Sequence, residues 1–112
     1  MTEQERDFSV STATWSGLRG IVLSGELDEL AAPALEAAMV AGSDGLPVLV
    51  DLSALTFISS SGLNALLRER PEGRPAVVCP PGNVRRVLEI VAAHKTLAVF
   101  DTEEEAVAKL CG

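Results

Sequence analysis

Hydrophobic residues near the start of the chain follow two spacings, and each spacing predicts a different element. Phe8 and Val10 alternate with polar residues, and an apolar run at 21–23 follows a Ser16-Gly17 turn signal, so this region predicts a β-hairpin. Apolar residues then recur at helical spacing over 31–40. The stripe of this helix that is predicted to be buried consists of Ala31, Ala34, Leu35, Ala38 and Met39.

Beyond residue 47, strand signals alternate with helical ones. The apolar run at 48–50 predicts a strand buried on both faces that ends at Asp51, followed by a short apolar loop and a helix beginning near Ser60. Strand signals at 76–79 and 97–100 each precede a further helix. In these later helices the side chains predicted to face inward are Leu63, Leu66, Leu67, Val84, Val87, Leu88 and Val91. The side chains predicted to face outward are Arg85, Arg86 and Glu89. The last helix is predicted to begin with a capping box formed by Thr102 and Glu105.

An initial hairpin followed by alternating strands and helices predicts an α/β fold. We expect one mixed β-sheet, parallel in its later part, with about five strands and about four helices packed against it. The length of 112 residues suits a single domain spanning 1–112, in which residues 1–6 are expected to be a flexible N-terminus.

The charge of the chain narrows the classes of partner. Nine Lys and Arg residues stand against 16 Asp and Glu residues, which gives a formal net charge of −7. An acidic protein repels phosphate backbones and anionic lipid, so neither nucleic acid nor a membrane surface is expected as a direct partner. The polar first ten residues and the lack of a long apolar run predict a cytoplasmic protein.

The residues that most often bind metal are few and scattered. Cys79 lies in an apolar run, Cys111 is the penultimate residue, and His94 has neither a cysteine nor a second histidine nearby. This pattern predicts no disulfide framework, no metal site and no cofactor, with His94 at the exposed end of a helix.

The most unusual stretch is the run of three serines, Ser59, Ser60 and Ser61, directly before a helix. A serine at such a junction is explained by capping, because its hydroxyl accepts from unpaired backbone N–H groups. Three in a row exceed what one cap requires. Serine hydrolysis would need a Gly-x-Ser-x-Gly turn and a histidine base beside these serines, and the sequence has no such turn here. A phosphate-binding loop would need to end in Gly-Lys-Ser or Gly-Lys-Thr, which is missing. A phospho-aspartate receiver would need a pair of acidic residues, which is missing as well.

Two motifs resemble those of a known family. Gly25-Glu26-Leu27-Asp28, and the run from Val48 to Leu63 that ends in Ser-Ser-Ser-Gly-Leu, are similar to the STAS domain of bacterial anti-sigma factor antagonists. The resemblance covers nearly the whole chain. It implies a protein that binds an anti-sigma factor, itself a serine kinase, so that a sigma factor is released, and that loses this binding when a motif serine is phosphorylated.

The resemblance also implies which residues act. Matching Gly62 to the glycine of the Asp-Ser-Ser-Gly motif places the phosphorylated residue on Ser60, and the family's aspartate is Ser59 here. The residues expected to bind the partner are Asp28, Ser59, Ser61, Gly62 and Asn64. A serine phosphatase is a further expected partner, and the chain is expected to be a monomer or weak dimer without enzyme activity. The alternatives are a STAS scaffold or lipid-transport subunit that is never phosphorylated and, more remotely, a small serine-dependent enzyme.

Overall fold

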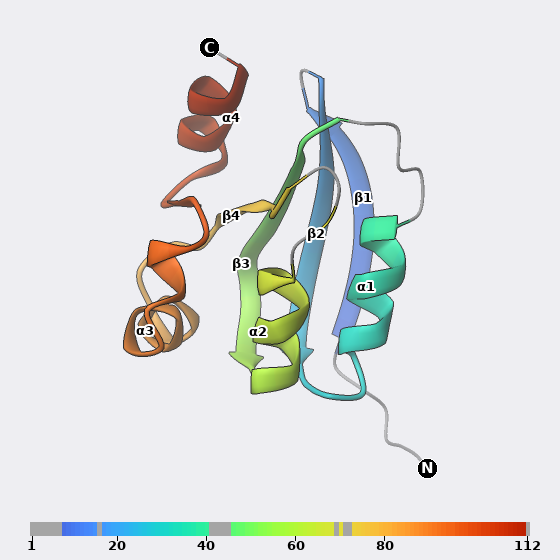
Figure 1. Ribbon diagram of the computed structural model, residues 1–112, viewed down its shortest axis with the longest axis vertical. Helices are drawn as coiled ribbons and strands as arrows, with labels where there is room; N and C mark the ends of the chain where they lie inside the picture. The colour runs from blue at the N-terminus through green and yellow to red at the C-terminus, as the bar shows by residue number, and fades with distance from the viewer. Residues whose placement is uncertain (1–7, 16, 41–45, 69, 71–72, 112) are drawn as a thin grey trace.

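The computed structural model describes residues 8–15, 17–40, 46–68, 70 and 73–111, which form the predicted five strands and four helices (Figure 1). The strands are β1 (Phe8–Trp15), β2 (Leu18–Leu27), β3 (Val48–Ile58), β4 (Ala76–Val78) and β5 (Val99–Phe100). The helices are α1 (Ala32–Val40), α2 (Ser60–Leu67), α3 (Asn83–Ile90) and α4 (Glu103–Cys111), with a short 3-10 helix, η1 (Ala93–Lys95). The α/β prediction is confirmed, while the predicted N-terminus at 1–6 lies outside the described residues.

The five strands form one sheet in the order β1-β2-β3-β4-β5. β1 and β2 pair antiparallel as the predicted hairpin, with Trp15 opposite Leu18 and Gly17 in the turn at φ +86°. All later neighbours pair parallel, because each connection returns through a helix. The predicted mixed sheet with a parallel later part is therefore confirmed.

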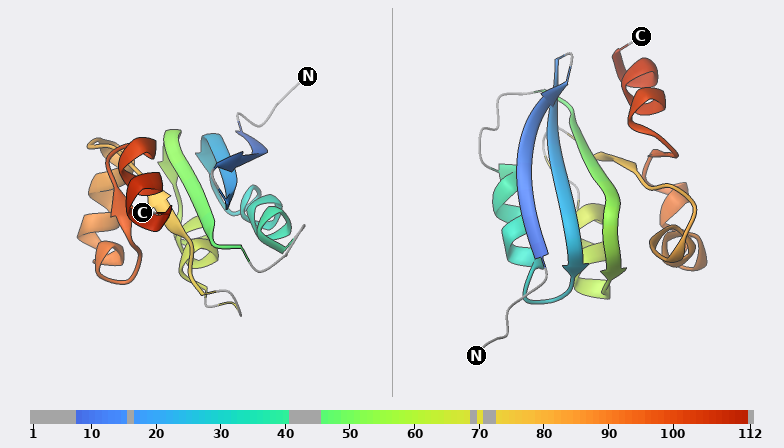
Figure 2. Two further views of the ribbon diagram at one scale, coloured as in Figure 1. Left: turned by 90° about the horizontal axis from the view of Figure 1, so that it is seen from above. Right: turned by 180° about the vertical axis from the view of Figure 1, so that it is seen from behind.

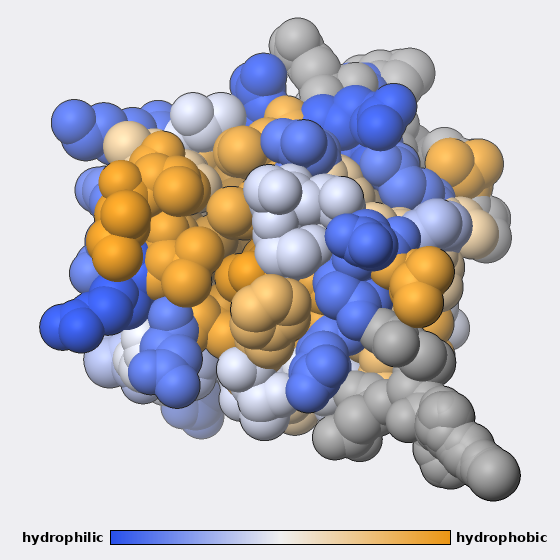
Figure 3. All heavy atoms as spheres, turned by 90° about the horizontal axis from the view of Figure 1, so that it is seen from below, coloured by the Kyte–Doolittle hydropathy of each residue, from blue (hydrophilic) through white to orange (hydrophobic). Residues whose placement is uncertain are grey.

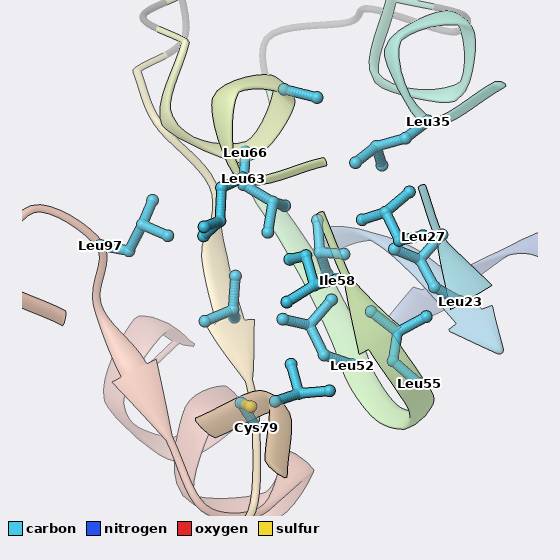
Figure 4. Close-up of a cluster of buried hydrophobic side chains, with 14 of the residues drawn as sticks. Leu23, Leu27, Leu35, Leu52, Leu55, Ile58, Leu63, Leu66, Cys79 and Leu97 are labelled. Atoms are coloured by element: carbon cyan, nitrogen blue, oxygen red, sulfur yellow. The ribbon is translucent and has the colours of Figure 1, made fainter. Parts of the chain in front are cut away.

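The sheet has a separate cluster of buried residues on each face. The larger cluster lies under α1, α2 and α3, and Figure 4 shows Leu23 and Leu27 of β2 facing Leu35 of α1 and Leu63 of α2 across it. A smaller cluster under α4 joins Leu18, Leu49 and Ala106. Seen from behind, α4 lies on the β4 and β5 side of this second face, where its Ala106 contacts the cluster (Figure 2).

The predicted loop after Asp51 is wrong, because β3 continues through Ile58. Parallel pairing of β2 with β3 shifts register twice, once between Val22 and Ser24 and once between Gly25 and Glu26, and each shift adds a residue on β3. β4 pairs with β3 only over Leu49–Asp51, so the second half of β3 pairs with β2 alone. β2 likewise extends beyond the apolar run at 21–23 that predicted it, through Leu27.

The helix predictions hold with small corrections. Ala34 is exposed although it was expected to be buried, and Val91 is 51% exposed because α3 ends at Ile90 and Ala92 takes a left-handed conformation. Arg85, expected to face outward, donates to the Cys79 carbonyl and to Asp101 Oδ1, both at 2.7 Å. It therefore ties α3 to the ends of β4 and β5.

The predicted capping box forms in a variant at the start of α4, in which the carboxylate binds the residue before Thr102 instead of Thr102 itself. Glu105 N donates to Thr102 Oγ1, and the Glu105 carboxylate accepts from Asp101 N, each at 3.1 Å. His94 is exposed in η1, as expected. Cys79 is buried, and burial raises the pKa of its thiol to about 11, so it stays protonated at neutral pH.

None of the helices among the described residues has the length and apolar character needed to cross a bilayer.

Candidate functional site

The run of serines lies where β3 ends and α2 begins. Ser59 is the N-cap of α2, with extended backbone angles (φ −94°, ψ 173°), and its Oγ accepts from Gly62 N at 3.2 Å. Capping requires one hydroxyl, and the structure places that role on Ser59. Ser60 and Ser61 are the first two residues of the helix itself.

The first turn of α2 is fixed directly on the end of β2. Ser59 N donates to the Leu27 carbonyl at 2.9 Å, which joins the cap to the neighbouring strand. A Cβ atom on Gly62 would lie 2.7 Å from Leu27 Cγ and 2.9 Å from the Leu27 carbonyl oxygen, both closer than real contacts allow. Gly62 is buried at this contact. Its lack of a side chain is what allows α2 to approach the strand so closely.

Ser60 is exposed at the start of α2, and its hydroxyl has no hydrogen-bond partner among the described residues. The first turn of α2 contains no acidic residue. Backbone N–H groups at a helix N-terminus attract anions, so the helix favours negative charge at this position. The geometry therefore supplies an accessible hydroxyl that the fold itself does not use.

Asp28 has a local structural role just after β2. Its Oδ1 accepts from Leu30 N at 3.1 Å and from Ala31 N at 3.0 Å, and its carbonyl accepts from Ala32 N at 2.9 Å. Aspartate stabilises such turns because its short carboxylate reaches the backbone two residues on. Asp28 thus directs the chain from β2 into α1, and the predicted contact of Asp28 with a partner stays a prediction.

An open groove of about 600 Å³ separates α1 from α2. It is lined by Glu29, Ala32, Pro33, Glu36, Ser61, Asn64 and Arg68. The structure therefore brings Ser61 and the exposed Asn64 together with α1, whereas Asp28, Ser59 and Ser60 do not line the groove. Glu36 closes one side, since it binds Arg68 Nε at 3.1 Å and Arg70 at 2.7 Å.

Phe57 was missed by the sequence prediction and is 49% exposed beside the serines. It pairs in register with Glu26, which is exposed on β2. Figure 3 shows this end of the molecule, where hydrophobic patches are separated by hydrophilic side chains. Aromatic residues are enriched at protein interfaces, and no sequence signal distinguished Phe57 from a core residue.

Known proteins share this fold. A 30% identical relative, the anti-sigma-F factor antagonist RsfB of Mycobacterium tuberculosis, aligns over 110 residues, which cover 93% of this chain and 90% of the relative. A crystal structure of an anti-sigma factor antagonist from Mycobacterium paratuberculosis superposes with a TM-score of 0.81 at 28% identity, covering 94% of this chain and 95% of that one. The unphosphorylated form of the anti-sigma factor antagonist SpoIIAA gives a TM-score of 0.63 at 27% identity, with coverage of 94% and 98%.

The model of the STAS domain matches residues 11–106, a range that begins within β1, includes the serine run and ends in the first turn of α4. The resemblance of the two motifs to this family is thereby confirmed, and the chain belongs to the STAS domain family.

Proposed function

We propose that the chain is an anti-sigma factor antagonist that is switched off by phosphorylation of Ser60. The observation that carries the proposal is an exposed, unused hydroxyl on the first residue of α2, held in place by the Ser59 cap and the Gly62 contact. Relatives named as anti-sigma factor antagonists support the general role. The function is one of binding, without catalysis by this chain.

The proposed partner is an anti-sigma factor that is also a serine kinase. Its docking surface on this chain comprises Ser60, Ser61, Asn64 and the loop at Asp28, with Ser59 and Gly62 as the framework that holds them. Sequestering the anti-sigma factor frees a sigma factor, so the chain acts in the cytoplasm on transcription without touching DNA, in keeping with its net charge of −7. A serine phosphatase then restores the active form.

The first test maps the phosphate. Incubation with the cognate anti-sigma kinase and ATP is expected to add one phosphate to Ser60, because Ser59 is engaged as the cap and Ser61 is only half exposed. Intact mass and peptide mapping check this, with Ser60→Ala as the blocked variant and Ser61→Ala as its matched control. Phosphate retained in Ser60→Ala, or lost in Ser61→Ala, would contradict the assignment.

Ser59 stands where the family motif has aspartate, which removes one negative charge beside the acceptor. Ser59→Asp is expected to keep the stability of the domain, since aspartate caps helices as well as serine does, and to change the rate of phosphorylation or the affinity for the partner. Ser59→Asn is the matched control because it retains the cap without the charge. Thermal melts and kinase assays of both variants decide; identical kinetics for both would show that the charge does not matter.

The substitution at Ser59 also favours a second candidate function, a STAS scaffold or subunit of a lipid-transport system that is never phosphorylated. The two functions make different predictions for one experiment. A scaffold binds its partner equally well with serine, alanine or aspartate at position 60, whereas the switch loses affinity with aspartate alone. Pull-down of partners from the source cell with these three forms, followed by identification of an anti-sigma factor or of transporter subunits, separates them.

A further inference from the structure

A cavity of about 420 Å³ lies at the end of the sheet where β3 and β4 begin. It is bordered by the last turn of α1, by the segment that leads into β4 and by the last turn of α4, which Figure 1 shows at this end of the sheet. Packing inside a protein rarely leaves voids larger than a water molecule, whereas small-molecule sites measure about 300–1,000 Å³. The cavity therefore has the size of a binding site for a small molecule.

The walls of the cavity are mainly apolar. The described residues that contribute apolar surface to it include Met39, Val48, Ala76, Ala98 and Leu110. Leu110 is 38% exposed, so part of this apolar surface is in contact with water. Covering apolar surface is favourable in proportion to the area removed from water. A ligand with a hydrocarbon body therefore gains free energy by entering the cavity.

The cavity also contains two arginines, and only one of them has its charge matched. Arg70 has 8% of its side chain exposed, and its guanidinium donates to the Glu36 carboxylate at 2.7 Å and to the Ala65 carbonyl at 3.0 Å. Arg74 is exposed, and its Nε donates to the Leu67 carbonyl at 2.7 Å. Among the residues that the structure describes, the two terminal nitrogens of Arg74 have no partner and no acidic residue lines the cavity. Arg74 thus brings an unmatched positive charge to an apolar cavity.

We propose that this cavity binds an amphiphilic carboxylate. The two terminal nitrogens of Arg74 hold the carboxylate, because a guanidinium presents pairs of N–H donors that match the two oxygens of a carboxylate. The hydrocarbon chain of the ligand lies against Met39, Val48 and Leu110. One unmatched guanidinium suits one negative charge, which favours a carboxylate over a doubly charged phosphate ester.

The net charge of the chain decides against a small anion. At −7 the chain repels anions from solution, and one exposed guanidinium attracts a carboxylate only weakly. Contact with the apolar walls has to supply the rest of the affinity. An anion with a hydrocarbon body is therefore expected to bind, whereas an anion of the same charge without one is not.

The site is separate from the proposed function. Ser60 follows the end of β3, whereas the cavity lies where β3 begins. Binding of a carboxylate is measured without an anti-sigma factor, so the two proposals fail separately.

Calorimetry with three small probes tests the class of ligand. Octanoate, kept below the concentration at which it forms micelles, is expected to bind in a saturable manner and to raise the melting temperature, because it binds only the folded chain. 1-Octanol lacks the charge and is expected to bind at least about tenfold more weakly, the usual effect of losing hydrogen bonds to a charged group. Acetate lacks the hydrocarbon chain and is expected not to bind. Absence of saturable octanoate binding, or an equal affinity for octanol or acetate, overturns the proposal.

Substitutions in the cavity test where the probe binds. Arg74→Gln is expected to weaken octanoate binding at least about tenfold and to leave octanol binding unchanged, a difference that a loss of stability would not produce. Arg86→Gln is the matched control, since Arg86 is exposed on α3 and does not line the cavity, although its loss changes the net charge equally. Ala98→Leu places a larger side chain in the cavity and is expected to weaken both probes. Equal effects of Arg74→Gln and Arg86→Gln, or full octanoate binding by a folded Ala98→Leu variant, overturn the proposal.

Discussion

Phosphorylation of Ser60 is expected to abolish binding to the anti-sigma factor while leaving the stability of the domain unchanged or slightly raised. The phosphate adds about −1.5 to −2 charges at neutral pH. Placed on the first residue of α2, this charge faces the free N–H groups of the helix, where an anion is favourable by about 0.3–1 kcal/mol. The fold therefore gains a little from the modification that ends its function.

The added charge is expected to weaken binding to the partner. Ser60 is exposed, and a partner that docks on the start of α2 covers it, so the phosphate must then lose its water. We expect the affinity to fall at least about 100-fold, equal to about 2.7 kcal/mol. Calorimetry with the anti-sigma partner and thermal melts of the phosphorylated and unmodified chains measure the two effects separately.

A matched variant identifies the effect of position. Thr96→Asp adds a carboxylate at an exposed hydroxyl residue that precedes β5, at the opposite end of the parallel strands from Ser60. It is expected to leave partner affinity unchanged, whereas Ser60→Asp lowers it. A fall in melting temperature on phosphorylation would mean that the switch acts through the fold. Unchanged affinity for a proven partner would remove Ser60 as the switch.

The sequence predicted the parts of the fold in which hydrophobic residues recur at a regular spacing and a turn or capping residue marks the end of the element. The hairpin has alternation and a Ser16-Gly17 turn, and the helix after the serines has Leu63 and Leu66 on one face. The second half of β3 fails this rule because of its two register shifts. Each shift inserts a residue, so Leu52, Leu55 and Ile58 are buried at a spacing of three, which does not indicate a strand.

The candidate site was predictable in its chemistry and less so in its geometry. Three serines before a helix indicated a cap, but the choice of Ser59 depends on where β3 ends, and that end was hidden by the same register shifts. The exposure of Phe57 has the same cause. The pairing of Glu36 with Arg70 could not be predicted, since it joins α1 to the segment after α2 across 34 residues and no local spacing of residues encodes it.

Gly62→Ala is expected to lower the melting temperature by roughly 5 °C, which corresponds to a net loss of about 1 kcal/mol. Two effects of opposite sign compete. The backbone of Gly62 has no positive φ, so alanine gains about 1 kcal/mol of helix propensity. Overpacking costs about 1–3 kcal/mol, and here one of the crowded atoms is the Leu27 carbonyl oxygen, which also accepts from Ser59 N at 2.9 Å. A flexible side chain can move aside and a hydrogen-bonded backbone cannot, so the loss exceeds the gain.

A double-mutant cycle with Leu27 shows whether this contact is the cause. Leu27→Ala removes Cγ and Cδ2, the two side-chain atoms that the new methyl group would meet at 2.7 and 2.9 Å, and leaves the carbonyl oxygen in place. Because Leu27 is buried, its truncation alone costs about 2–5 kcal/mol. The double variant is expected to lose less stability than the sum of the two single losses, and the difference is an interaction free energy of about 1 kcal/mol. Chemical denaturation of the four proteins measures this difference. Strict additivity would mean that Gly62 matters for a reason other than its contact with the Leu27 side chain.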